Sequence, residues 1–114
     1  MEKDKPILVY ATFPSRSEAE RIGGRLVENG LAACVNILPG MVAIYIWEGE
    51  RQQDEECAMI IKSRASLAAR IITTVRRLHP YEIPALVVLD IVDGAPPFLA
   101  WILAQTAAPK PDTA

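Results

Sequence analysis

Short apolar runs alternate along the chain with longer stretches in which apolar residues recur every three or four positions. Residues 7–13 are such a run, almost wholly apolar and ended by a proline, which predicts a buried strand. Residues 15–29 carry apolar side chains at helical spacing. Ser15 and Glu18 fit a capping box at the start of this stretch, and Gly30 follows as a left-handed stop. We therefore expect a helix over 15–29.

The middle of the chain predicts a long hairpin. Residues 31–38 alternate as a strand, and Pro39 with Gly40 should bend it or insert a bulge. Residues 41–47 resume the strand, residues 48–50 turn the chain, and residues 51–62 return as a third strand.

The last third predicts a helix, a strand and a second helix. Residues 63–78 have an apolar stripe at helical spacing that ends before His79 and its following proline. Residues 85–91 are apolar on both faces, which suggests a central strand, and paired prolines open a helix over 96–106. We expect one domain over residues 1–106 and a disordered tail over 107–114.

The predicted order is strand, helix, two strands, helix, strand, and an extra C-terminal helix. This order is the signature of an α+β ferredoxin-like βαββαβ fold, an antiparallel sheet with two helices on one face. A fold of this kind does not by itself define a function.

Two segments carry more apolar surface than one copy of the chain can hide. Residues 31–47 would span about 55 Å as a strand, whereas a domain of this length has a radius of gyration of only about 13 Å. The outer part, residues 41–47, is nearly all apolar, and apolar side chains surround most of the helix at 96–106. The simplest partners are further copies of the same chain. The alternative is a hairpin that curls back onto its own domain.

Charge and hydropathy exclude several classes of protein. The net charge of −2 argues against a domain built to neutralise many nucleic-acid phosphates. No segment has the 20 or so apolar residues of a membrane span, and the first six residues lack the positive region of a secretory signal. We expect a cytoplasmic protein that binds neither nucleic acid nor membrane.

Three motifs together resemble the CutA family of divalent-cation tolerance proteins. They are Leu-Ala-Ala-Cys-Val-Asn-Ile at 31–37, Tyr-Ile-Trp-Glu-Gly at 45–49 and His-Pro-Tyr-Glu-Ile-Pro at 79–84, and the similarity extends over residues 7–103. The resemblance implies a ferredoxin-like homotrimer joined through the long hairpin and the C-terminal helix. It also implies a role in tolerance to divalent metals, copper above all, and no enzymatic activity. The plan is similar to that of the trimeric PII signalling proteins.

The chain departs from the family pattern at several positions. Glu50 stands where a lysine is usual, and Ala85 where a glutamate is usual. Some members carry further cysteines in the first strand and second helix, where this chain has Tyr10 and, nearby, Thr74. This chain therefore lacks the thiols that a metal site of that kind would use.

Cys34 and His79 are the candidate metal ligands. A thiolate suits soft ions such as Cu(I), whereas the competing interpretation of Cys34 is a small core residue. His79 follows a helix and opens the third motif, although a helix-capping role would also explain it. The acidic tip of the hairpin could attract cations loosely, or could simply be solvated (Glu48, Glu50, Asp54, Glu55 and Glu56).

A second hypothesis is a regulatory or scaffolding trimer, similar to PII, that binds a small ligand in clefts between subunits. The candidate ligand-binding residues are Lys62, His79, Tyr81, Glu82 and Trp47, although Trp47 would equally serve as interface packing.

Cys57 is expected to be structural. With Gly49 and Glu50 as the hairpin loop, Cys57 would lie opposite Val42, about 26 Å along the strand from Cys34, which excludes a bond between the two thiols.

Two further classes of function are weaker. An anion could bind at the start of the first helix, near Ser15 and Arg16, but no paired nucleophile and base supports an enzyme. The third strand starts with acidic residues and has no aromatic side chain, which argues against RNA binding.

Overall fold

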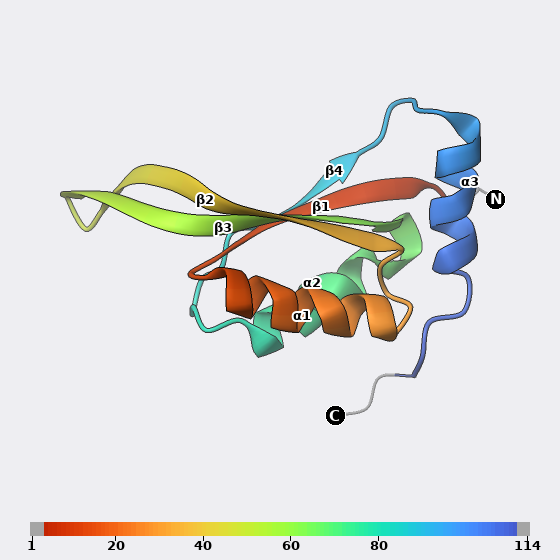
Figure 1. The fold of residues 1–114 in the computed structure, drawn as a ribbon, viewed down its shortest axis with the longest axis horizontal. Coiled ribbons are helices and arrows are strands. Elements are labelled where there is room, and N and C mark those ends of the chain that lie inside the picture. The colour runs from red at the N-terminus through yellow and green to blue at the C-terminus, as the bar shows by residue number, and fades with distance from the viewer. Residues whose placement is uncertain (1–3, 112–114) are drawn as a thin grey trace.

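The computed structural model describes residues 4–111 and confirms the α+β ferredoxin-like fold. Its elements are β1 (Pro6–Phe13), α1 (Arg16–Glu28), β2 (Cys34–Trp47), β3 (Glu50–Arg64), a 3₁₀ turn (Ala65–Leu67), α2 (Ala68–Leu78), β4 (Leu86–Asp90) and α3 (Pro96–Gln105). The strands form one antiparallel sheet in the order β2-β3-β1-β4. Helices α1 and α2 cover one face of the sheet, and α3 stands across its end (Figure 1). Within the described residues, no helix is long and apolar enough to cross a membrane.

Local signals place α1 as predicted. The Ser15 hydroxyl accepts a hydrogen bond from the Glu18 amide at 3.2 Å, and this satisfies one of the free N–H groups at the helix start. Gly30 has a φ of 71°, which a side chain would disfavour, and it turns the chain toward β2. The helix then presents its fully buried face to the sheet (Ala19, Ile22, Gly23 and Leu26).

Alternate residues of β1 and β3 form the sheet side of the core. Ile7, Val9, Ala11 and Phe13 point from β1 toward the helices and are at most 1% exposed. Met59 and Ile61 of β3 join them, and buried side chains of α1 and α2 complete the core on the helical side of the sheet. Each of these side chains larger than alanine stabilises the fold by about 1.5–3 kcal/mol through burial.

The bulge predicted at Pro39 and Gly40 is confirmed. The pairing of β2 with β3 shifts register between Leu38 and Met41, and Gly40 takes a φ of 78°. The strand itself begins at Cys34 rather than Leu31, because the Leu31 amide bonds back to the last turn of α1 at 2.9 Å.

The predicted register of the hairpin is wrong. Trp47 pairs with Glu50, so the loop is Glu48 and Gly49, both with positive φ as in a type I′ turn. Val42 therefore lies opposite Glu55, and Cys57 lies beside the bulge and pairs with Phe13 of β1. Cys34 pairs with Lys62, so the two cysteines lie five positions apart, about 17 Å. Both cysteines are free.

The prediction that β4 is central is also wrong. It pairs only with β1 among the described strands and forms an edge of the sheet. Val87 is 50% exposed and Leu89 47% exposed on the face opposite the helices. Apolar residues on both faces of a strand therefore do not require a central position within one chain.

The boundary between β3 and the following helix differs from the prediction. Ser63 and Arg64 belong to β3 rather than to a helix, because the Ser63 hydroxyl is buried and donates to the Leu31 carbonyl at 2.6 Å.

Part of the segment expected to be a disordered tail contacts the rest of the domain. Residues 107–111 pack against the body, with the Lys110 amide donating to the Asn29 carbonyl at 2.8 Å, while 112–114 lie outside the described residues.

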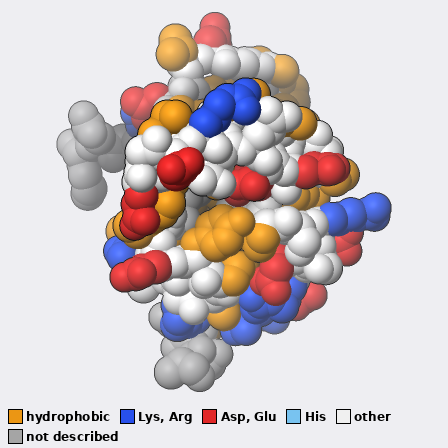
Figure 2. Space-filling view, turned by 90° about the vertical axis from the view of Figure 1, so that its left-hand side faces the viewer, with side chains coloured by type: hydrophobic (Ala, Val, Ile, Leu, Met, Phe, Trp, Pro, Cys, Tyr) orange, Lys and Arg blue, Asp and Glu red, His pale blue; other side chains and the backbone are white. Residues whose placement is uncertain are grey.

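The hairpin projects from the body and does not curl back onto it (Figure 1). It sets the longest dimension of the molecule, 47 Å. Its apolar side chains are open: Ile44 is 58% exposed and Ile46 66% exposed. Figure 2 looks at the molecule from this end and shows hydrophobic side chains at the surface among acidic ones.

Candidate functional site

Cys34 lies in a small mixed cluster where β2 and β3 meet α3. Lys62, its cross-strand partner, places Nζ 3.8 Å from the Cys34 sulphur, and the Asn36 amide nitrogen lies 3.9 Å from it. The Lys62 ammonium also lies 5.4 Å from the ring centre of Phe98, a cation–π contact. We call Cys34, Asn36, Lys62 and Phe98 the Cys34 cluster. Cys34 as a residue is partly exposed, and its sulphur accepts hydrogen bonds from two nitrogen donors.

His79 lies in a second cluster at the other end of the sheet. It is only 7% exposed, and its ring stacks on Phe13 with the centroids 4.8 Å apart. Nε2 lies 2.7 Å from the Thr12 carbonyl oxygen, which only accepts, so Nε2 carries the hydrogen. The Tyr81 amide donates to Nδ1 at 3.0 Å. Both ring nitrogens are therefore engaged, and they hold the 79–84 loop against β1.

The predicted site residues divide among three places. His79, Tyr81 and Glu82 share one loop, Lys62 joins Cys34, and Trp47 lies at the hairpin tip opposite Glu50. Glu50, the partner of Trp47, lies twelve positions before Lys62 on β3, which places Trp47 about 40 Å from Lys62. One chain does not unite these residues in a single ligand site.

The same geometry separates the two predicted metal ligands. His79 stacks on Phe13, which pairs with Cys57, and Cys34 pairs with Lys62, so about 17 Å of strand lies between them. Neither nitrogen of His79 offers a free lone pair to a metal ion in this arrangement. Within residues 4–111 no group of three or more His, Cys, Asp or Glu side chains is placed to hold a metal ion. The pair does not fit a shared ion, whereas Cys34 alone fits a soft ion as one ligand.

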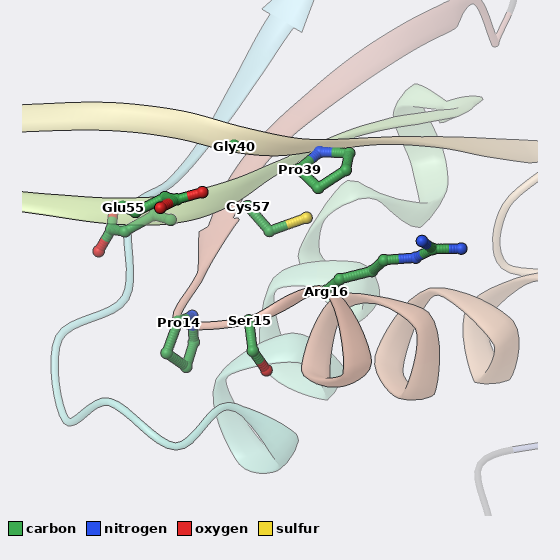
Figure 3. Close-up of a pocket in the computed structure, with 8 residues that line it drawn as sticks. Pro14, Ser15, Arg16, Pro39, Gly40, Glu55 and Cys57 are labelled. Atoms are coloured by element: carbon green, nitrogen blue, oxygen red, sulfur yellow. The ribbon is translucent and has the colours of Figure 1, made fainter.

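A hollow of about 360 Å³ opens between the β2 bulge and the start of α1. Figure 3 shows the Cys57 sulphur directed toward the gap between Pro39 and the first turn of α1. Burial raises the pKa of the Cys57 thiol, and this effect outweighs the lowering of the pKa by the nearby charge of Arg16. The neutral thiol therefore packs as part of the core. The groups expected to hold an anion here already have partners, since Ser15 caps α1 and Arg16 pairs with Glu20.

Two tyrosines and two carboxylates face each other on the side of the sheet away from α1 and α2. The Tyr45 hydroxyl donates to Asp54 at 2.5 Å, and the Tyr81 hydroxyl lies 3.4 Å from a Glu56 oxygen. The hydrogen bond to Asp54 raises the pKa of Tyr45 to about 12. Burial and the nearby Glu56 carboxylate raise the pKa of Tyr81.

This arrangement predicts an unusually late tyrosine titration. Because the folded pKa of Tyr45 lies above its ordinary value of 10, the stabilising bond to Asp54 is intact below that pH and is lost as pH rises through about 12. Near-ultraviolet absorbance of tyrosinate should show a component with a midpoint of about 12. Tyr45→Phe should remove that component, and Asp54→Asn should move it toward lower pH. An identical titration curve for Asp54→Asn would contradict the assignment.

Sequence reasoning missed the contacts of three members of these clusters. Asn36 shares a strand face with Cys34, and that alternation was visible, but its contact with the sulphur was not. Glu56 reads as part of a solvated acidic tip, yet it faces Tyr81. Phe98 was considered only as part of an apolar helix in need of partners, and its contact with Lys62, which leaves it 45% exposed, was not foreseen.

Fold and site together define a class of protein: a small ferredoxin-like α+β domain with an overlong apolar hairpin and a cysteine near the root of that hairpin. Residues 7–105 match the family described as CutA1 divalent ion tolerance protein. The chain belongs to this CutA1 family.

Individual relatives agree with the family match. The divalent-cation tolerance protein CutA of Thermus thermophilus is 39% identical over 99 residues, which cover 87% of this chain and 96% of that protein. The chloroplastic protein CutA of Arabidopsis thaliana is 39% identical over 100 residues, 88% of this chain and 55% of that protein. The chain spans between 52% and 62% of the length of the plant and vertebrate relatives that it matches.

Solved structures share the fold closely. CutA1 from Shewanella sp. SIB1 has a TM-score of 0.88 at 34% identity and covers 94% of this chain and 100% of that one. CutA from Archaeoglobus fulgidus, titled a periplasmic divalent cation tolerance protein, has a TM-score of 0.85 at 40% identity, covering 89% and 98%.

Proposed function

We propose that the protein works as a homotrimer in tolerance of divalent cations and binds a transition metal ion, copper in the first place, through the sulphur of Cys34. The observation that carries the metal part is the Cys34 cluster, in which a partly exposed cysteine lies on the paired strands β2 and β3. The proposal places the protein in the cytoplasm and gives it no catalytic step.

The exposed apolar surface supports the trimer. One side of the hairpin presents Val42, Ile44 and Ile46, each between 58% and 66% exposed. The edge strand β4 and helix α3 add further open apolar side chains (Val87, Leu89, Phe98 and Trp101). Patches of this extent on a soluble domain mark interaction sites, and further copies of the chain are the simplest partners.

The chemistry of Cys34 supports copper over harder ions. A thiolate is the preferred donor for Cu(I), whereas Mg²⁺ and Ca²⁺ prefer oxygen ligands. Binding would replace the hydrogen bonds that Lys62 and Asn36 make to the sulphur. Cys34 supplies one ligand, and we expect solvent or a second copy to supply the others.

Titration of the purified protein with Cu(I) tests this assignment. Wild type should bind, and Cys34→Ser should lose the site, with an affinity loss of about 100-fold or more because an oxygen donor suits a soft ion poorly. Cys57→Ser is the matched control, since its thiol is 1% exposed and remains neutral. Calorimetry that shows equal binding by wild type and Cys34→Ser would contradict the proposal.

A PII-like role in binding a small ligand is the second candidate, and the 79–84 loop favours it. Tyr81 is 40% exposed and Glu82 is exposed, while His79 fixes the loop that carries them. In a trimer, the hairpin of a neighbouring subunit would bring its Trp47 to an inter-subunit cleft beside this loop. Heat with a panel of nucleotides but none with metals would favour this candidate over the first.

A further inference from the structure

Cys34 and Lys62 are held side by side across strands β2 and β3. They are direct cross-strand partners, and such partners carry their Cβ atoms about 4.5–5.5 Å apart. The Ala33 amide donates to the Lys62 carbonyl at 2.8 Å, which fixes the two backbones at this pair. The Lys62 Nζ atom lies 3.8 Å from the Cys34 sulphur, so a short movement of the lysine side chain brings nitrogen and sulphur into contact.

The Lys62 nitrogen has no stronger partner than this sulphur. Its other contact is with the ring of Phe98, whose centre lies 5.4 Å away. Within residues 4–111 no carboxylate forms an ion pair with Lys62. A change in its contact with Cys34 therefore breaks no ion pair.

Cys34 is open to oxidation but has no second thiol of its own chain within reach. It is partly exposed and has a cation beside it, surroundings in which cysteines react with peroxide. Cys57, the other cysteine, is 1% exposed and lies about 17 Å away along β3. The Asn36 nitrogen lies 3.9 Å from the sulphur, but the lone pair of an amide is delocalised into its carbonyl. The amine of Lys62 is therefore the nucleophile that oxidised Cys34 meets.

We propose that peroxide joins Cys34 to Lys62 through a reversible sulphur–nitrogen bond. Hydrogen peroxide first transfers one oxygen to the thiol, which becomes a sulfenic acid, and its other oxygen leaves as water. Two electrons pass from the sulphur to the peroxide in this step. The Lys62 ammonium then releases a proton to solvent, and its lone pair attacks the sulphur. The S–O bond breaks, the nitrogen loses a second proton, and that proton leaves with the hydroxide as water.

The reverse reaction needs a small thiol as reductant. Two thiol molecules return Cys34 and Lys62 to their free forms and leave as a disulfide, so the electrons balance. Formation of the bridge also prevents further oxidation of Cys34 to the sulfinic acid, which is not reversed in this way.

The bridge uses up the thiol that the proposed function assigns to copper, and its consequence for metal binding rests on that function. A bridged chain has no free thiolate at Cys34 and should not bind Cu(I) there. The bond itself forms without metal and is measured without one.

Mass spectrometry of the metal-free protein after exposure to hydrogen peroxide tests the bridge. Remaining thiols are blocked with iodoacetamide, and the protein is digested with and without earlier reduction by dithiothreitol. Lys62→Arg removes the attacking amine but keeps a cation beside the sulphur, because the guanidinium stays charged. Lys5→Arg is the matched control, since Lys5 is an exposed lysine just before β1 that pairs with Asp90.

Wild type and Lys5→Arg should give a linked peptide pair, Cys34 to Lys62, that is lighter than the separate peptides by two hydrogens and disappears on reduction. Lys62→Arg should lose the linked pair and carry about tenfold more sulfinic acid at Cys34. Cys57 should stay reduced in all three proteins.

The proposal is overturned if Cys34 stays reduced in wild type, or if it becomes sulfinic acid or a disulfide between two copies without the link. Links from Cys34 to other lysines in equal yield would overturn it too, because the cross-strand contact would then direct nothing. If Cys34→Ser left copper binding intact, only the metal proposal would fail, and the linked peptide would stand. Unlinked wild type would remove the bridge and leave the copper titration as it is.

Discussion

Replacing Ile44 by glutamate is expected to dissociate the proposed trimer into protomers of 12.5 kDa. Ile44 lies midway along the projecting part of β2, opposite Gln53, and is 58% exposed in the isolated chain. A partner that covers it would bury most of an isoleucine side chain, which is worth about 2–3 kcal/mol for each copy.

Three copies contribute to one trimer, so the loss sums to about 6–9 kcal/mol, and a glutamate buried without a counter-charge adds to it. The trimer dissociation constant should rise by about four or more powers of ten. Hairpin and body lie far apart in one chain, so the protomer itself should still fold.

Sedimentation at micromolar concentration measures this directly, with circular dichroism to show that the protomer is folded. Ser17→Glu is the control, because it adds the same charge at an exposed position of α1, away from the hairpin. A wild-type protein that sediments as a folded 12.5 kDa particle would refute the trimer, and an Ile44→Glu trimer would refute this face as its interface.

Features set by neighbours in sequence were predictable. The Ser15 and Glu18 pair placed the start of α1, and Pro39 with Gly40 placed the bulge, because caps and bulges depend on backbone chemistry within a few residues. The element order then fixed the ferredoxin-like topology.

Features set by pairing across the chain were not predictable. The hairpin loop puts Glu48, a non-glycine residue, at a φ of 50°, so sequence gave no clear reason to choose it over Gly49 and Glu50. That choice, with the bulge, decides that Cys57 lies beside the bulge of β2 and not opposite Val42.

The candidate site shows the same division. The motifs supplied Cys34 and His79 as chemistry-bearing residues, and Lys62 was a candidate ligand contact outside the motifs. Their grouping depends on contacts over long sequence distances, such as the bond from His79 to Thr12, 67 residues earlier. Strand alternation puts Asn36 beside Cys34, but only the register brings Lys62 to the same sulphur.

Phe13→Ala is expected to cost about 3–5 kcal/mol of stability, the largest loss we expect from a core substitution that also touches a candidate site. The Phe13 ring is fully buried at the end of β1 and stacks on His79. Its removal leaves a cavity between β1 and the loop that His79 anchors, so the loss combines missing apolar burial with missing support for that ring.

Urea unfolding at one fixed protomer concentration measures the loss, since an oligomer's apparent stability depends on concentration. Phe13→Leu is the matched control, because it keeps most of the buried volume and should cost less than about 1.5 kcal/mol. Hydrogen exchange supplies the second readout. Phe13→Ala should deprotect the Tyr81 amide, which donates to His79, before it deprotects the Leu31 amide that bonds to the end of α1. Equal losses for the two variants, or uniform deprotection, would show that the ring holds the whole core and gives the His79 loop no particular support.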